Sequence, residues 1–482
     1  MSAPDISTET MGQFRGSGVE KHSTVLLGAG ASITSGLPSW DEFAARLLIS
    51  ADVVSESLAT HLLTRQDPMI AVEAARSNIE AADSSIETTW TQQLSDQLYA
   101  TVSPLESLSP SPLHQAAVGH YLKSPENRSL VTLNFDVLIE AELNYELEEE
   151  SNLESKPSLT SITNSESRQG EHSVHHLHGL ITPDRAEDVV LTLNDFTALL
   201  ENRNSWQFKY LKSAVYKGAL VIAGTSYRDP DLRQWLHAAL KSKPDNHKAF
   251  VLLARESFGI SKDEFEMLES ALSSQWKAVG LHPVLMQDHT DAAQIIRELD
   301  YVNREEYISP QDRCKIIWGV HVRNFGELQS VYVDELGKNA SNLKNLFEVS
   351  TLDVTLWLSN GDGKLIRWAS QDRVYRSLDA LREVEAGHDS PWIAGQALAQ
   401  ESVIISDLSD HPTRRWNSVI AAPISVEHPL LPFVTCAVLT VGIPESANSF
   451  EEEAVKWGDE LGKIADQWSS RIFERVYPGE EA

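Results

Sequence analysis

The chain has 482 residues, 41% of them hydrophobic, and its 40 basic and 70 acidic side chains give a formal net charge of −30. A chain of this length exceeds one ordinary core, so we expect two or three domains. The acidic balance opposes non-specific binding to nucleic acid or to an anionic membrane. The longest apolar run, FVTCAVLTVGI near residue 440, is too short to span a bilayer.

The start of the chain and its cysteines predict a cytoplasmic protein. The first residues, MSAPDISTETMGQF, lack the basic start and the apolar stretch of a secretory signal, and we interpret residues 1–20 as a flexible tail. Cys314 and Cys436 are the two cysteines of the sequence, too few for a disulfide framework or a four-cysteine zinc site. We therefore expect a reducing compartment and no metal.

Residues 21–302 alternate strand-like and helical patterns. Continuous apolar runs separated by helices indicate a parallel sheet covered on both faces, which predicts a Rossmann-like α/β domain. The mostly helical stretch 41–122 is longer than one crossover requires and predicts a helical insertion. The polar, acidic, serine-rich segment 146–172 is typical of a solvated insertion loop. The predicted strands are 23–27, 129–133, 188–193, 219–224, 249–254 and 282–286.

The pattern changes after residue 302. Apolar residues at helical spacing from Leu328 to Leu346 predict a connecting helix within 303–348, with a stripe that packs on its own domain or on a second chain. The turn sequence of residues 360–363, NGDG, predicts a hairpin between strands 354–358 and 364–368. Further strands follow, and a closing helix carries Ala454, Trp457, Leu461, Ile464 and Trp468 on one face. Residues 349–482 are therefore predicted as a separate antiparallel α+β domain.

The first motif that suggests chemistry is GAGAS, residues 28–32, which directly follows the first predicted strand. Small residues there let backbone amides approach a pyrophosphate. No third glycine completes the dinucleotide fingerprint GxGxxG. Ser39 and Glu42 stand at capping-box spacing, so part of the following GLPSW segment starts a helix. We interpret this loop as a nucleotide-binding element.

The second motif, Asn134-Phe135-Asp136, ends the strand 129–133, where parallel sheets place the groups that contact ligands. An asparagine orients a water or a ribose hydroxyl, and a nearby aspartate holds an amide. Alternatively, Asn134 ends the strand and Asp136 caps the next helix. The residues alone leave both interpretations open.

The third motif is the histidine-rich segment HSVHHLHG, residues 172–179. On a strand His176 and His178 face the same way, which permits a metal site, but no carboxylate or cysteine partner stands at a suitable spacing. His178, beside the sterically open Gly179, is the better candidate for a general base. A polar strand with incidental histidines is the alternative.

The fourth motif, GTSYRDP at 224–230, ends the strand 219–224 and opens a helix with a proline in its first turn. Its hydroxyls and amides are suited to the ribose or phosphate of a nucleotide. As structure alone, it is a well-capped helix start.

Taken in this order, GAGAS with GLPSW, LNFD, HG and GTSYRDP resemble the sirtuin (silent information regulator) family, especially its divergent bacterial antiphage-defence branch, which includes the Thoeris effector. The resemblance spans about residues 20–300 and implies NAD as substrate. It implies Asn134, Asp136 and His178 as catalytic residues, with His178 as the base. The NAD-binding residues that it implies are Gly28, Ala29, Gly30 and Ser32 on the pyrophosphate side, Gly224 and Ser226 toward the adenosine half, and Pro38, Trp40 and Asp229.

Two departures from the deacylating sirtuins narrow the implied activity. The chain lacks their four-cysteine zinc ribbon and has GLPSW in place of their GIPDFR-like loop. The resemblance therefore implies an NAD hydrolase that releases nicotinamide and leaves ADP-ribose, and so drains NAD in abortive infection. The alternatives are a non-catalytic NAD or ADP-ribose sensing module, and an NAD-dependent protein deacylase or ADP-ribosyltransferase.

The second domain, over about 350–476, resembles a GAF sensor domain in the order of SVIISDLSDHP, SVIAAPISV, CAVLTVGIP and the terminal helix. This resemblance implies either a regulatory small-molecule ligand or a purely structural module. The relatives imply a homo-oligomer, and a protein partner encoded nearby stays open.

Overall fold

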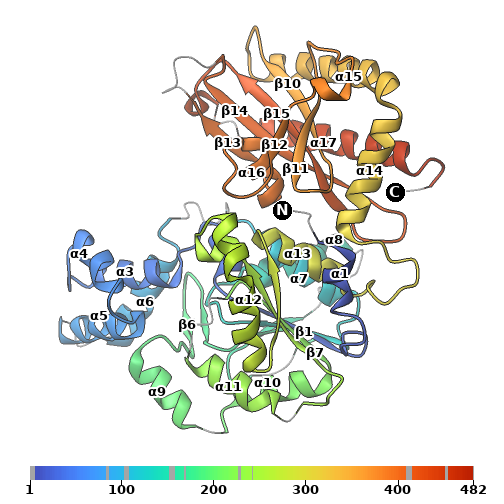
Figure 1. Cartoon of the computed structure of the whole chain (residues 1–482). Coiled ribbons are helices and arrows are strands. Elements are labelled where there is room, and N and C mark those ends of the chain that lie inside the picture. The colour runs from blue at the N-terminus through green and yellow to red at the C-terminus, as the bar shows by residue number, and fades with distance from the viewer. Residues whose placement is uncertain are drawn as a thin grey trace. The chain divides into compact units, whose positions relative to one another are not determined.

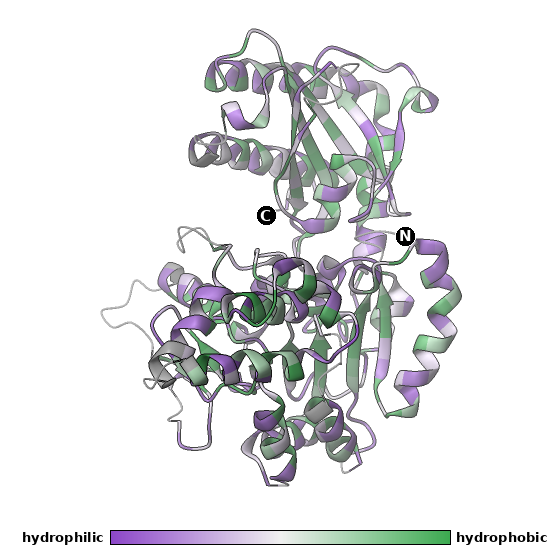
Figure 2. Cartoon of the chain, turned by 90° about the vertical axis from the view of Figure 1, so that its left-hand side faces the viewer, coloured by the Kyte–Doolittle hydropathy of each residue, from purple (hydrophilic) through white to green (hydrophobic). Residues whose placement is uncertain are grey.

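The computed structural model describes residues 6–82, 86–101, 108–150, 158–167, 170–202, 204–225, 230–241, 243–408, 415–450 and 454–480. Its contacts divide the chain into two compact units. Unit 1 comprises Met1–Arg15, Ala254–Lys262 and Met286–Ala482, and unit 2 comprises Gly16–Leu253 and Asp263–Leu285. Figure 2 shows that apolar residues concentrate along the strands of both units.

Unit 2 is built on a seven-stranded parallel sheet of order β3-β4-β2-β1-β7-β8-β9 (Figure 1). The strands β1, β7 and β8 are buried along their whole length, as expected for a sheet covered on both faces. This confirms the predicted Rossmann-like α/β fold. The strands are β1 (Ser23–Leu27), β2 (Arg128–Thr132), β3 (Leu159–Ile162), β4 (His172–His176), β7 (Ala219–Ala223), β8 (Ala249–Ala254) and β9 (His282–Met286), with a separate pair β5 (Leu180–Ile181) and β6 (Ala186–Glu187).

The register of the central strands sets the position of the candidate site. Leu27 at the end of β1 lies opposite Thr132 of β2 and Ala223 of β7. Three strands therefore end side by side, and the segments that follow them meet at one edge of the sheet.

The predicted helical insertion is present. Side chains of α3, α5 and α6 share an apolar cluster that includes Phe43, Leu47, Val72 and Leu94. The helices of this stretch are α3 (Trp40–Ser50), α4 (Glu56–Leu63), α5 (Pro68–Ala82), α6 (Ile86–Leu98) and α7 (Pro112–Leu122). The other helices of the parallel-sheet region are α2 (Gly30–Ile33), α8 (Leu138–Glu150), α9 (Leu193–Glu201), α10 (Trp206–Lys217), α11 (Pro230–Leu240) and α12 (Lys262–Ala278).

Two local predictions for unit 2 are wrong. Residues 188–192 form a loop instead of a strand, because Asp188 adopts a left-handed φ of 50° and Thr192 caps α9 in a capping box with Asp195. The segment 146–172 is more than a loop, since α8 extends into it and β3 pairs in parallel with β4. Its residues 151–157 and 168–169 lie outside the described part of the chain.

Unit 1 contains a six-stranded sheet of order β12-β11-β10-β15-β14-β13 whose strand pairs are antiparallel. The predicted hairpin is present, because β10 and β11 pair across the turn at 360–363. A core of buried side chains from α14, α15, α17 and the strands confirms the predicted α+β class. The strands are β10 (Asp353–Ser359), β11 (Lys364–Ser370), β12 (Glu383–Glu385), β13 (Ile404–Asp407), β14 (Ser418–Val426) and β15 (Val434–Ile443).

The connecting segment consists of two helices instead of one, α14 (Pro310–Arg323) and α15 (Phe325–Leu346). The apolar stripe of α15, from Leu328 to Leu343, is buried in the core of its own unit. The same core takes up Trp457 and Trp468 of the closing helix α17 (Ala454–Val476). The other helices are α1 (Thr8–Gly12), η2 (Arg255–Phe258), α13 (His289–Glu298), η3 (Leu378–Ala380), α16 (Ile393–Gln400) and η4 (Ala447–Ser449).

The N-terminal segment differs from the predicted flexible tail in its described part. Ser7 caps α1, and Met11 and Phe14 are fully buried. Helix α13, before residue 302, falls in unit 1, so the contacts divide the chain differently from the predicted domain boundaries, which stay a prediction. No described helix combines the length and the apolar character needed to cross a membrane.

Candidate functional site

A pocket lies in unit 2 at the carboxyl edge of the parallel sheet. It is partly open to solvent, and ≈ 740 Å³ of space not filled by protein atoms lies within it when that open solvent is included. Residues from all three central strand ends, from α3 and from the loop before α9 line it. These residues are Gly28, Ala29, Ser32, Leu37, Pro38, Ser39, Trp40, Phe43, Leu98, Leu133, Asn134, Phe135, Asp136, His178, Val190, Phe196 and Thr225.

The loop after β1 packs directly against the end of β7. The Gly28 N–H donates to Ala223 O at 3.0 Å, and the Gly30 N–H donates to Gly224 O at 2.7 Å. A Cβ on Gly28 would lie 2.7 Å from Cβ of Thr225, and Gly224 has a φ of 67°, so both positions require glycine. Gly28, Ala29 and Ser32 of this loop line the pocket, whereas Gly30 and Gly224 are not among the lining residues.

Ser32 stands at the centre of a polar network on the pocket floor. Its Oγ donates to Oδ2 of Asp136 at 2.8 Å and accepts from Nδ2 of Asn134 at 2.9 Å. The ring of His114 lies 3.4 Å from the same oxygen through Nε2. All four residues are at most 8% exposed. The structure thus joins the predicted residues Ser32, Asn134 and Asp136 in one buried hydrogen-bonded group.

The hydrogen bonds of His114 define its tautomer. The Ser111 N–H donates to Nδ1 at 3.1 Å, so the ring proton is on Nε2 and points to Ser32. Burial lowers the pKa of His114 to about 4, against the opposing effect of Asp136 and Glu140. His114 is therefore a neutral donor at pH 7. Its place in the site could not be predicted from the sequence, because its contact with Ser32 joins residues 82 positions apart along the chain.

The amide of Asn134 has a fixed orientation. Its Nδ2 donates to Gly28 O at 3.0 Å and to Oγ of Ser32, which uses both amide hydrogens. The remaining polar atom is the acceptor Oδ1, on a side chain that lines the pocket. Such an oxygen is suited to accept a hydrogen bond from a water or a hydroxyl group.

Asp136 caps the next helix, as one of the two interpretations of the sequence has it, and it also lies in the pocket lining. Its Oδ1 accepts from the Leu138 N–H at 3.1 Å and so caps the start of α8. Its Oδ2 accepts from Ser32 in the pocket floor. The helix cap thereby fixes the position of the pocket carboxylate.

His176 lies behind the pocket instead of in it. Its Nδ1 contacts Asn134 O at 3.2 Å, and its Nε2 pairs with Oε1 of Glu140 at 2.7 Å. Burial alone would lower the pKa of His176, but Glu140 raises it above the ordinary value, and the pair lowers the pKa of Glu140. The expectation that His176 and His178 share a strand face is wrong, because β4 ends at His176. Glu140 is the carboxylate partner that sequence reasoning missed.

His178 lines the pocket on the segment after β4. Its ring contacts Phe196 edge-on, with centroids 5.4 Å apart, and its carbonyl accepts from the Val190 N–H at 2.9 Å. Gly179 has a φ of 86°, and a Cβ there would lie 2.4 Å from Asp188 O. The glycine of the HG motif therefore lets the loop before α9 approach, and that approach brings Val190 to the pocket.

The remaining predicted residues divide into two groups. Pro38 and Trp40 of GLPSW line the pocket, and Ser39 caps α3 in the predicted capping box with Glu42. Ser226 and Asp229 lie outside the described residues. Sequence reasoning missed the aromatic lining, in particular Phe43 and Phe196, because a single apolar residue on a helix resembles any core position.

Comparison with known families identifies the central part of the chain. A comparison with curated proteins finds no match. Residues 128–284 match the model of the SIR2-like domain, and this range contains Asn134, Asp136 and His178, whereas the loop 28–32 precedes it. SIR2-like domains are NAD-dependent enzymes in general. The match therefore supports a sirtuin-like family for this part of the chain, with NAD as substrate.

Proposed function

We propose that the protein is an NAD glycohydrolase. The observation that carries the proposal is the presence of Asn134 Oδ1, the Asp136 carboxylate and His178 around one pocket in the SIR2-like part of the chain. A module that only bound NAD would need neither an oriented acceptor nor a base. The reaction converts NAD⁺ and water into nicotinamide, ADP-ribose and a proton.

The chemistry demands little covalent assistance from the protein. Nicotinamide is a positively charged leaving group, so the bond from the anomeric carbon to the ring nitrogen breaks with its electron pair moving to nicotinamide. Positive charge then develops on the ribose, and a preorganised carboxylate stabilises it. Asp136, already oriented by Ser32 and by the start of α8, is suited to that role.

Water completes the reaction at the anomeric carbon. We assign its orientation to Asn134, since the only polar atom that this side chain has left for the pocket is an acceptor. His178 takes the proton through the ribose hydroxyls as general base. The aromatic walls around it, including Phe43 and Phe196, exclude bulk water from the developing charge.

The proposed biological role is an antiphage effector that depletes NAD and halts the infected cell. Two features of the sequence support this role. The segment GLPSW resembles the corresponding loop of the antiphage-defence sirtuins, and the sequence lacks a four-cysteine zinc ribbon. An enzyme that is toxic to its own cell must be kept inactive until infection. We assign this control to the GAF-like domain of residues 349–482. The domain would act by binding a small-molecule ligand or by assembling the chain into a homo-oligomer in the cytoplasm.

The test is nicotinamide release from NAD by the purified full chain, with and without a small-molecule extract of phage-infected cells. We expect His178→Ala to lower turnover at least 100-fold, since loss of a positioned general base costs about 10²–10⁴ in rate. Asn134→Ala should also lower turnover strongly, since the attacking water would no longer be oriented. His237→Ala, which removes an exposed histidine of the same unit, should retain turnover. Full turnover in either pocket variant would remove the role assigned to that residue.

The alternative functions give different results in the same assay. NAD binding without nicotinamide release under any condition would indicate the NAD or ADP-ribose sensing module. Transfer of a labelled ADP-ribose group to protein would indicate an ADP-ribosyltransferase, and release that requires an acylated peptide would indicate a deacylase.

A further inference from the structure

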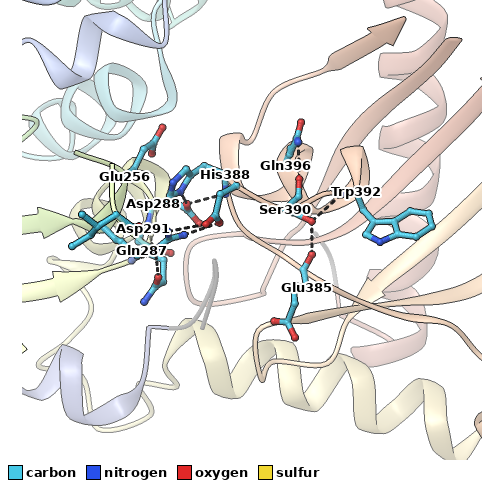
Figure 3. Close-up of polar contacts among 12 residues, drawn as sticks. Glu256, Gln287, Asp288, Asp291, Glu385, His388, Ser390, Trp392 and Gln396 are labelled. Atoms are coloured by element: carbon cyan, nitrogen blue, oxygen red, sulfur yellow. Dashed lines mark hydrogen bonds and ion pairs between the residues drawn. The ribbon is translucent and has the colours of Figure 1, made fainter. Parts of the chain in front are cut away.

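Three chain segments of unit 1 bring two carboxylates and an imidazole together, whereas the pocket described above belongs to unit 2. Glu256 lies in η2, Asp288 precedes α13, and His388 lies between β12 and α16 (Figure 3). One ligand atom of each residue lies within 4.8 Å of those of the other two. Since His388 is 100 residues away from Asp288 along the chain, no local sequence motif predicts this cluster.

Asp288 carries the observation that points to a ligand. Its side chain is 0% exposed. Its Oδ1 accepts from the His388 N–H at 3.0 Å and lies 2.5 Å from Nδ1 of the same residue. Its Oδ2 is buried and has no hydrogen-bond partner among the described residues. A buried carboxylate oxygen without a hydrogen-bond partner destabilises the folded chain. This oxygen, Oδ2, belongs to the same carboxyl group as Oδ1, which faces His388.

The charge balance of the cluster favours a cation. Arg255, the nearest guanidinium along the chain, is paired bidentately with Asp389 at 2.8 and 2.7 Å. The carboxylates of Glu256 and Asp288 stand beside one imidazole, so a divalent cation bound by all three would balance their negative charge.

The backbone around the three side chains is held in place before any ligand arrives. The Glu256 N–H donates to Gln287 O at 3.1 Å, and Oδ2 of Asp291 accepts from the N–H groups of Gln287 and Asp288. On the other side, Oγ of Ser390 donates to Glu385 O at 2.7 Å (Figure 3). Such supporting contacts are what orient metal ligands.

We propose that Glu256, Asp288 and His388 form a binding site for one Zn²⁺ ion. One imidazole nitrogen and two carboxylate oxygens suit this borderline cation better than Ca²⁺ or Mg²⁺, which prefer all-oxygen ligands. The ion would connect the segments that follow β8 and β9 to the segment that precedes α16, so its role in unit 1 is a structural clip. The inference is independent of the proposed NAD hydrolysis.

The test is isothermal titration calorimetry, in which ZnCl₂ is added to the full chain after EDTA treatment and dialysis. Thermal unfolding of the same protein is then followed with and without Zn²⁺. We expect one Zn²⁺ per chain, a raised unfolding temperature, and much weaker binding of MgCl₂. Asp288→Asn and His388→Gln should each weaken Zn²⁺ binding at least tenfold. His428→Gln, which removes another histidine of unit 1 that is not part of the cluster, should bind like the wild type.

Two outcomes would overturn the proposal. One is the absence of Zn²⁺ binding by the wild-type chain, and the other is binding that Asp288→Asn and His388→Gln leave unchanged. Glu256→Gln keeps the inference testable if the Asp288 variant fails to fold, because the Glu256 side chain is only partly buried. Unchanged Zn²⁺ affinity in Glu256→Gln would also overturn the three-ligand site.

Discussion

Acidification should destabilise the protein through His114. Burial lowers the pKa of this histidine in the folded chain from 6.5 to about 4. Between these values the unfolded chain binds a proton that the folded chain does not, so stability falls as the pH falls. The difference between the two pKa values corresponds to about 3 kcal/mol below pH 4, of which about 2 kcal/mol is already lost between pH 7 and pH 5.

The structure gives a second reason for this resistance to protonation. A proton on Nδ1 of His114 would face the Ser111 N–H, which now donates to that atom at 3.1 Å. His114→Gln retains an acceptor and a donor but does not titrate. The loss of unfolding free energy between pH 7 and pH 5 should therefore be about 2 kcal/mol smaller in His114→Gln than in the wild type.

The assay is urea unfolding at both pH values, followed by far-UV circular dichroism with each transition fitted separately. Comparing the two losses removes the contributions of other buried histidines, such as His175, whose pKa burial also lowers to about 4. His237→Gln is the exposed control and should behave like the wild type. Equal losses in wild type and His114→Gln would refute the reasoning, because His114 would then not be neutral in the folded chain.

Two further results are expected. Gly179→Ala should cost about 3 kcal/mol or more in thermal unfolding, because its Cβ would lie 2.4 Å from Asp188 O, whereas Gly36→Ala, with a φ of 89° but no described atom within 4 Å, should cost about 1 kcal/mol. Equal costs would contradict the steric argument. Cys314 and Cys436 should resist a thiol reagent until urea unfolds the chain, because both are buried and because a hydrogen bond with Cys314, together with burial, raises the pKa of Cys436. Rapid labelling of the native protein would contradict this expectation.

The fold was predictable where burial is continuous along the sequence. The strands β1, β7 and β8 are buried at every position because both faces of the sheet are covered, and their runs of large apolar residues identify them in the sequence. The edge strand β3, LTSI, was not predicted because three of its four residues are only partly buried and two of the four are polar. The strand predicted at residues 188–193 was wrong for the opposite reason, since the apolar run there forms the loop that brings Val190 to the pocket and then begins α9.

The candidate site was predictable only at the ends of strands. Asn134 lies two residues after the end of β2 and His178 two residues after the end of β4, and the topology of a parallel sheet then brings them to one edge. Glu140 and His114 were missed because their contacts depend on how α8 and α7 pack. No spacing in the sequence encodes that packing.

The fixed amide of Asn134 also makes the pocket selective in the ligands that it accepts. Both of its hydrogens are taken by Gly28 and Ser32, so a ligand group placed against this side chain meets an acceptor and cannot turn it into a donor. Alcohols, amines and protonated heterocycles should be tolerated at that point, whereas carboxylates and phosphates should be repelled. An inhibitor of this pocket should therefore present a hydrogen-bond donor to Asn134 and keep its anionic groups elsewhere.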